Sequence, residues 1–237
     1  MRLSLVSWIR NLFQVGDPDP TPLTAAQLDA IIHSHFGSAL EGAAFSMTGR
    51  RRWVRSRCNE FRDVFEIASL KGGRCYPRWG LSLNYCPQIK GKKIHFHRTE
   101  KSAQIDVVWD PIDYVDAPSR AMESWVFDSL WTKPRKASSQ AGKVAKKAVP
   151  RALTWFSGNN SVDDIITVLE AKKTEKVYRF GFANYVQQPL ALALSYAQIG
   201  NSVRAAQLLE EYIVSYEVLP EAAQRLRSMI VSQTFKT

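Results

Sequence analysis

The stretch from residue 45 to residue 109 most constrains the fold, because it consists of strand-like runs joined by short connections. Five runs carry β-branched and aromatic residues, at residues 52–57, 64–70, 79–85, 95–97 and 105–109. Gly72 and Gly73 mark a turn after the second run, and Gly91 marks another after the third. Parallel strands need a crossover of about a dozen residues or more, which these connections do not allow. The pattern therefore predicts an antiparallel meander of about five strands.

Helical periodicity flanks this stretch on both sides. Before it, Thr24 is the expected N-cap of a helix that runs to about residue 42, and Gln27 completes a capping box. After it, Ser119 is expected to cap a helix that ends before Pro134. Residues 133–149 are rich in Lys, Ala and Ser, so we expect either a solvated basic helix or a mobile linker there.

The segment 189–212 indicates two helices joined by a tight turn. Gly200 would supply the positive φ that closes the first helix, and Ser202 would cap the second. Small residues such as Ala197 and Ala205 allow the two backbones to approach closely. The pattern resembles one tetratricopeptide-type hairpin, but such repeats normally need about three copies to form a groove. We expect a packing hairpin that shields the rest of the protein.

These patterns together predict an α+β protein. Its antiparallel sheet is expected to be flanked by N-terminal helices and by a C-terminal helical layer that ends in the tetratricopeptide-like hairpin. The expected regions are an N-terminal helix and Pro-rich connector (1–22), a basic α+β domain (23–132), a basic linker or helix (133–151) and a helical region (152–237). The amphipathic N-terminal helix is expected to dock on the core, with an interfacial membrane helix as the alternative. No stretch approaches the roughly 18 apolar residues of a transmembrane span.

The net charge of +10 is confined to one part of the chain. The first 151 residues hold 24 Lys and Arg against 14 Asp and Glu, whereas the remaining 86 residues hold eight of each. A positive field this concentrated attracts phosphates, anionic lipids or acidic protein surfaces, and it does not choose among them.

Basic and aromatic residues alternate around residues 50–57, which is typical of a contact surface. On a strand, Arg51, Trp53 and Arg55 would share one face, and aromatic rings beside guanidinium groups can stack the bases of a single strand. In the alternative interpretation, Trp53, Trp79 and Tyr85 are core residues that the arginine stems cover. The expected binding residues are Arg50, Arg51, Arg52, Trp53, Arg55, Arg57, Arg74, Arg78, Lys90, Lys92 and Lys93.

Signatures of a metal site are weak. His95 and His97 would lie on one face of a strand, but a metal needs three or four ligands and no third has a characteristic spacing. We therefore expect neither a metal nor a cofactor. The acidic run could hold Mg²⁺ for phosphoryl chemistry, although we expect it to balance the basic strands or to lie in solvated loops. That run consists of Asp106, Asp110, Asp113, Asp116, Glu123 and Asp128.

Catalytic signatures are no stronger. The sequence holds no phosphate-loop, dinucleotide-binding or nucleophile-elbow motif. Its three cysteines, Cys58, Cys75 and Cys86, form no close pair and indicate neither a disulfide framework nor a zinc knuckle. A reducing, cytoplasmic location is therefore expected.

A family resemblance rests on residues 44–55. Here the predicted helix leads into Phe45, and Gly49, three arginines, Trp53 and Arg55 follow. This segment resembles the opening of a widespread bacterial family known as a domain of unknown function, and residues 64–70 and 79–83 are similar to two of its strands. The resemblance covers about residues 25–215, although Ala44 stands where the family prefers Gly. It implies a helical tail with a short hairpin. Because some members are encoded beside toxin or phage-defence genes, it also implies a partner-binding role, and it assigns no functional residue.

We therefore expect a non-enzymatic protein-binding module, an immunity or phage-defence accessory protein that binds an acidic protein through its basic sheet face. A nucleic-acid-binding protein that uses the same face is the alternative. A metal-dependent phosphoryl-transfer or hydrolytic enzyme, with His95, His97 and the acidic run, is third. The sequence leaves the oligomeric state open.

Overall fold

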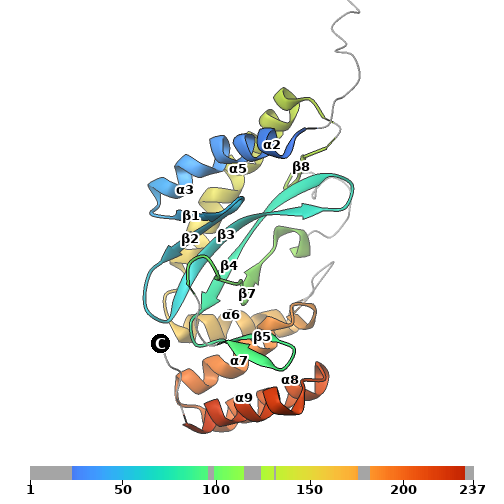
Figure 1. Ribbon diagram of the computed structural model, residues 1–237. Coiled ribbons are helices and arrows are strands. Elements are labelled where there is room, and N and C mark those ends of the chain that lie inside the picture. The colour runs from blue at the N-terminus through green and yellow to red at the C-terminus, as the bar shows by residue number, and fades with distance from the viewer. Residues whose placement is uncertain (1–22, 96–98, 115–123, 131, 176–181, 233–237) are drawn as a thin grey trace, which may run out of the picture.

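A computed structural model describes residues 23–95, 99–114, 124–130, 132–175 and 182–232. It confirms the α+β class: helices cover one face of an antiparallel sheet, and a stack of further helices lies at one end of it (Figure 1). The expected N-terminal helix and Pro-rich connector, residues 1–22, lie outside the described residues.

The main sheet is the predicted antiparallel meander. Its strand order is β1-β2-β3-β4-β7, and the short β8 pairs with the beginning of β4. The strands are β1 (Ser46–Gly49), β2 (Arg52–Ser56), β3 (Phe61–Leu70), β4 (Arg74–Leu83), β7 (Val107–Trp109) and β8 (Phe127–Asp128). The runs predicted at 52–57, 64–70, 79–85 and 105–109 therefore all contribute strands to one sheet.

The run predicted at residues 95–97 differs from expectation. β6 (Lys93–His95) pairs with β5 (Gln88–Lys90) in a separate two-stranded hairpin, and residues 96–98 lie outside the described part of the chain. Gly91, with φ of 58°, forms the tight turn between these strands. This turn lets β5 and β6 pair with each other, so β4 pairs with β7 instead.

One helical segment precedes the sheet, as predicted. It consists of α2 (Ala25–Ile32), a turn of π-helix η1 (His33–Gly37) and α3 (Ser38–Gly42). The capping box is present: the Gln27 amide donates to Thr24 Oγ1 at 3.2 Å, and the Thr24 amide donates to Gln27 Oε1 at 3.0 Å.

The basic segment that was expected as a helix or a linker forms helix α5 (Pro134–Ser157). Pro134 begins the helix, where its missing N–H removes no hydrogen bond. Small and apolar side chains recur at helical spacing along one face, which packs against α2, η1 and the sheet. The fully buried members of this stripe include Ala137, Ala141, Ala148, Ala152 and Phe156.

The helix predicted from Ser119 to the residue before Pro134 is wrong where the structure describes it. Residues 124–130 form a turn and the short strand β8, while residues 115–123 and 131 lie outside the described part. Trp125 and Phe127 are buried here, and the Phe127 backbone pairs with Cys75 of β4. The open edge of β4 thus provides the backbone hydrogen bonds that a helix would otherwise supply.

The C-terminal layer is helical, as predicted. It comprises α6 (Val162–Thr174), the short 3₁₀ turn η3 (Phe182–Asn184), α7 (Gln187–Gln198), α8 (Ser202–Ser215) and α9 (Pro220–Ser232). The expected α7–α8 hairpin is confirmed, and Gly200 has φ of 82°. Its cap is one residue earlier than predicted, because Asn201 Oδ1 accepts the Arg204 amide at 3.1 Å while Ser202 is already helical.

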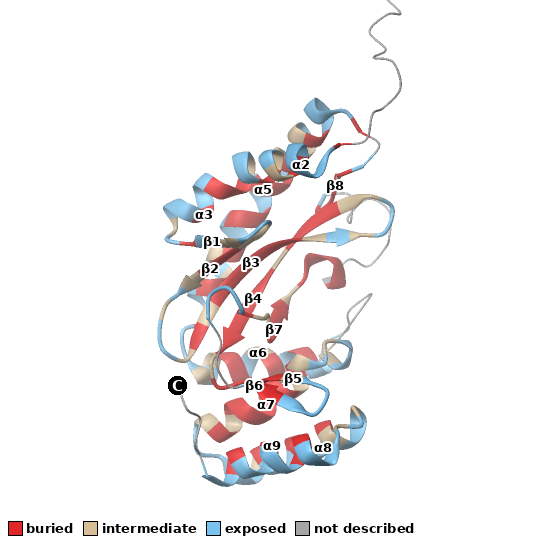
Figure 2. Cartoon of the chain, viewed as in Figure 1, coloured by how far each residue is buried: buried red, intermediate tan, exposed pale blue. Residues whose placement is uncertain are grey.

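A continuous apolar core joins these layers, and Figure 2 shows it as the buried interior of the sheet and the inner faces of the helices. Its centre is a row of aromatic rings across the strands: Phe65 and Trp79 stack with centroids 6.0 Å apart, and Trp79 and Trp109 at 4.3 Å. Among the described helices, none combines the length and the apolar composition that crossing a bilayer requires.

Candidate functional site

The strand arginines form ion pairs within the protein itself. Arg52 of β2, Glu66 of β3 and Arg78 of β4 lie opposite one another in the sheet register. Glu66 accepts from Arg52 Nε at 2.9 Å and Nη2 at 2.6 Å, and its other oxygen accepts from Arg78 Nε. One buried carboxylate therefore pairs with two of the expected binding cations, and the triad keeps a net charge of +1.

A second ion-paired triad lies on the opposite face of the same strands. The carboxylate of Asp63, fully buried, accepts from Arg55 Nη2 at 2.6 Å and lies 2.9 Å from Arg57 Nη2. Arg57 also donates to the Phe156 carbonyl at 2.9 Å, so it attaches the sheet to the end of α5. The Arg55 guanidinium stacks over the Phe45 ring at 4.6 Å.

The arginines of the turn before β2 and the three aromatic rings of the alternative interpretation are placed in two ways. Arg50 and Arg51 both lie beside Asp29 of α2, at 3.1 and 2.8 Å. Trp53 is fully buried, as are Trp79 and, nearly, Tyr85, which confirms the interpretation of these rings as core residues.

The hairpin cations lie away from the sheet. Lys90 and Lys93 are exposed, and Lys92 Nζ lies 2.9 Å from Glu221 of α9. His95 is exposed and His97 lies outside the described residues. Within the described residues, no three His, Cys, Asp or Glu side chains come close enough to hold a metal ion.

Helix α5 carries a positive surface that the predicted site omitted. All seven basic side chains from Lys133 to Arg151 are exposed, and this stretch of the sequence contains no acidic residue. Lys136 Nζ lies 3.4 Å from Asp128, but no described carboxylate pairs with Lys143 or Lys146. The run of seven cations without an anion was the signal available in the sequence.

A groove runs between α5 and the helix formed by α2, η1 and α3. We call it the α5 groove; its volume is about 800 Å³. Ala39, Ala145, Val149, Pro150 and Leu153 give it an apolar lining, and Ser34, His35, Ser138, Ser139, Gly142, Lys143 and Lys146 complete it. No acidic side chain is among these described lining residues.

His35 lines this groove and connects its two sides. His35 Nε2 and Ser138 Oγ share a hydrogen bond of 2.8 Å, which ties the π-helical turn to α5. Gly142 lies beside the His35 ring, since a Cβ there would come within 3.2 Å of it. The absent side chain thus permits the close approach of the two helices.

A second groove of about 640 Å³ follows the other side of α5. Lys143 lines both grooves, and Arg74 and Lys147 join it in the second, where Asp128 is also present. The Lys147 ammonium lies 3.8 Å from the centre of the Trp125 ring, and Arg151 stacks over Trp109 at 4.9 Å. Burial, followed by repulsion from Arg151, lowers the pKa of Lys147, as expected for clustered cations.

Half of the acidic run is buried rather than solvated. Asp106, Asp110 and Asp113 are almost fully buried, and Asp106 Oδ2 accepts the Leu83 amide at 2.8 Å. Asp116 and Glu123 lie outside the described residues, and Asp128 accepts from Gln140 Nε2 at 3.3 Å.

Asp110 is the centre of a buried hydrogen-bond network. Its Oδ2 accepts from Tyr76 at 2.9 Å and from Tyr185 at 3.2 Å, and its Oδ1 accepts the Ile112 amide at 3.0 Å. Burial raises the pKa of the Asp110 carboxyl, although these hydrogen bonds act in the opposite direction. The two tyrosine contacts of Asp110 connect separate parts of the fold, and the Ile112 contact is local to the turn, which together indicate a structural role.

Comparisons of the chain with protein-family models, curated proteins and solved structures find no match.

Proposed function

We propose that the protein is a non-enzymatic binding module whose α5 groove takes an acidic, amphipathic segment of a partner protein. One observation carries this proposal: the groove combines an apolar lining with the cations Lys143 and Lys146 and with no acidic lining residue. An amphipathic helix recognises such a groove by placing its apolar face inside and its charged face along the rim. The charge complementarity calls for acidic residues on that rim.

A polypeptide suits this surface better than a nucleic acid. The cations that line the α5 groove are lysines, which act as point charges. The strand arginines Arg52, Arg55, Arg57 and Arg78, which could grip phosphates with two parallel hydrogen bonds, are engaged by Glu66 and Asp63. The buried rings of Trp53 and Trp79 are not available for stacking bases. An apolar groove lining also adds nothing to the binding of a phosphate backbone.

The biological setting remains a prediction. We propose the cytoplasm as the compartment, supported by Cys58, Cys75 and Cys86, which form no disulfide. An immunity or phage-defence role is proposed from the family resemblance alone, with an acidic toxin or phage protein as the partner.

The binding proposal is tested with a fluorescent peptide that carries Glu and Leu at helical spacing. We expect saturable binding, and we expect the charge reversal Lys143→Glu with Lys146→Glu to weaken it about tenfold or more, since both cations are replaced by repelling anions. The matched control is Lys90→Glu with Lys93→Glu, which changes the net charge equally on the exposed hairpin and should weaken binding less than threefold. Fluorescence anisotropy at fixed ionic strength measures the peptide affinity of both double variants.

Two further probes make the experiment discriminating. A scrambled peptide of the same composition should bind several-fold more weakly, because it cannot present one apolar face. The peptide proposal would be rejected in favour of nucleic-acid binding if a DNA duplex or an RNA strand bound more tightly than the peptide and its affinity fell steeply with added salt. Equal losses in the two double variants would show that bulk charge, not the α5 groove, attracts the peptide.

A further inference from the structure

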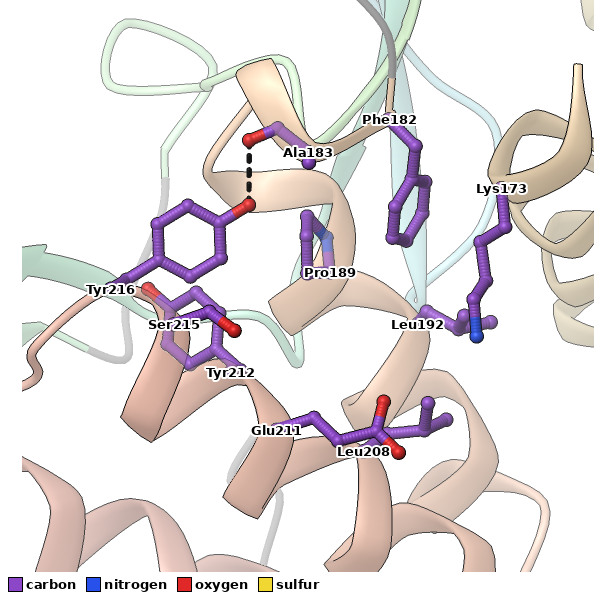
Figure 3. A pocket seen from close by; sticks show the side chains of 10 residues that line it. All are labelled: Lys173, Phe182, Ala183, Pro189, Leu192, Leu208, Glu211, Tyr212, Ser215 and Tyr216. Carbon is purple, nitrogen blue, oxygen red and sulfur yellow. Dashed lines mark hydrogen bonds between the residues drawn. The ribbon is translucent and has the colours of Figure 1, made fainter.

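The C-terminal helical layer contains a small pocket that is separate from the α5 groove. Helices α6, α7 and α8 and the turn η3 surround it, and its volume is about 160 Å³ (Figure 3). An aromatic and aliphatic surface makes up most of its lining, with Phe182, Pro189, Leu192, Leu208 and Tyr212 among the members. A cavity of about 150 Å³ lined by apolar groups is large enough to bind benzene. The pocket therefore has the size of one apolar side chain.

Contacts between elements hold the walls of this pocket in place. The Tyr216 hydroxyl at the end of α8 donates to the Ala183 carbonyl of η3 at 2.6 Å, a bond drawn in Figure 3. The Tyr212 and Tyr216 rings pack with centroids 4.9 Å apart. A preformed pocket loses little conformational freedom when a ligand enters, which favours the binding of small molecules.

Two opposite charges line the same pocket from different helices. Lys173 comes from α6 and Glu211 from α8, and Figure 3 shows Lys173 beside Leu192 and Glu211 beside Leu208. Each is held only loosely by a neighbour on its own helix: Lys173 Nζ lies 3.8 Å from Glu170 Oε2, and Glu211 Oε1 accepts from Gln207 Nε2 at 3.4 Å. Both charges thus stay available to a ligand.

We propose that this pocket binds a free amino acid with an aromatic or branched apolar side chain. The side chain would occupy the apolar interior, the carboxylate would meet Lys173 and the ammonium would meet Glu211. A ligand with only a negative charge would be repelled by Glu211, and one with only a positive charge by Lys173. The zwitterion satisfies both. This site is independent of peptide binding in the α5 groove, so either proposal can fail alone.

The test compares L-phenylalanine with two analogues that each lack one charge. Phenethylamine has no carboxylate, and 3-phenylpropionate has no ammonium group. We expect isothermal titration calorimetry and protein-observed NMR to show saturable L-phenylalanine binding, at least about tenfold tighter than that of either analogue, with shifts at Leu192 and Tyr212. No saturable binding at millimolar concentration, or equal binding of all three compounds, would overturn the proposal.

Charge variants then assign the two ends of the ligand. Lys173→Met should remove the preference for L-phenylalanine over phenethylamine, and Glu211→Gln should remove its preference over 3-phenylpropionate, because each variant deletes the partner of the missing group. Lys101→Met and Glu41→Gln are matched controls on exposed positions away from the pocket, and both preferences should survive in them.

Ser215→Trp, at an exposed lining residue, should block binding while the protein stays folded. Retained binding in that variant would contradict the proposed location.

Discussion

At the scale of single residues, the main result is that the strand arginines pair with buried carboxylates, and an exposed positive surface lies on α5 instead. Arg52 and Arg78 are far apart in the chain, and only the strand register places Glu66 between them. Composition gives the number of cations but not which of them a carboxylate neutralises. Lys143 and Lys146 of α5 have no described carboxylate partner, whereas Lys136 lies beside Asp128 and Lys147 donates to Ser124 Oγ at 2.8 Å.

Glu66→Gln tests the importance of the first triad. Burial raises the pKa of Glu66, but attraction to Arg78 and then to Arg52 outweighs it, so this pKa lies below its ordinary value. A carboxyl whose pKa is lowered on folding stabilises the folded state at pH values above its ordinary pKa. That stability is lost as the pH falls through the folded-state pKa. We expect the variant to lose about 3 kcal/mol at pH 7, the low end for a broken buried ion pair, because both guanidinium groups are about one-third exposed.

Urea unfolding at several pH values measures this loss. The difference between wild type and Glu66→Gln should narrow towards low pH, where the wild-type carboxyl is protonated as well. Glu41→Gln, an exposed control, should change the free energy of unfolding by less than about 0.5 kcal/mol. A pH-independent difference would mean that the variant acts through packing rather than charge.

At the scale of elements, the long and regular ones were predictable and the short ones were not. The capping box at Thr24 and the turn at Gly200 are local signals, and both elements were found where expected. β8 was missed because two residues of pairing to an open strand edge leave no periodic pattern. The burial of α5 was missed because five of its eight buried residues are alanines, and the lysines and serines between them are typical of a solvated segment.

Gly80→Ala tests an element contact that the sequence did not reveal. A Cβ on Gly80 would lie 2.1 Å from the Val107 carbonyl oxygen and 2.4 Å from Ile105 Cγ2, so the β4–β7 pair requires glycine. Because a backbone atom cannot move aside cheaply, we expect a loss of about 3 kcal/mol or more in thermal or urea unfolding. Gly42→Ala is the matched control, since a Cβ there meets nothing within 4 Å and should leave stability nearly unchanged. Similar stabilities for the two variants would contradict the tight β4–β7 contact.

At the scale of the whole molecule, the sheet and the C-terminal helices share one core. The buried apolar cluster extends without a break from Leu28 of α2 to Ile230 of α9. Polar contacts cross the same boundary: Tyr85 and Ser195 share a hydrogen bond of 2.8 Å, and the Val108 amide donates to Gln188 at 3.3 Å. The sequence showed a charged half and a neutral half, but charge asymmetry does not report how apolar faces meet. The neutral helices belong to the same packed unit as the basic sheet.

Leu194→Ala tests whether this shared core makes unfolding cooperative. Leu194 is fully buried in α7, and its truncation should lower the free energy of unfolding by about 2 to 5 kcal/mol. The chain has no tryptophan after Trp155, and its described tryptophans lie in the sheet, beside β8 and in α5, so tryptophan fluorescence does not report directly on α7. If the protein unfolds in one step, the fluorescence midpoint in urea and the hydrogen exchange of α7 amides should shift together. Val203→Ala, at a residue 82% exposed on α8, should shift neither. A fluorescence midpoint that stays in place while α7 exchange accelerates would mean that the helical layer opens as a separate unit.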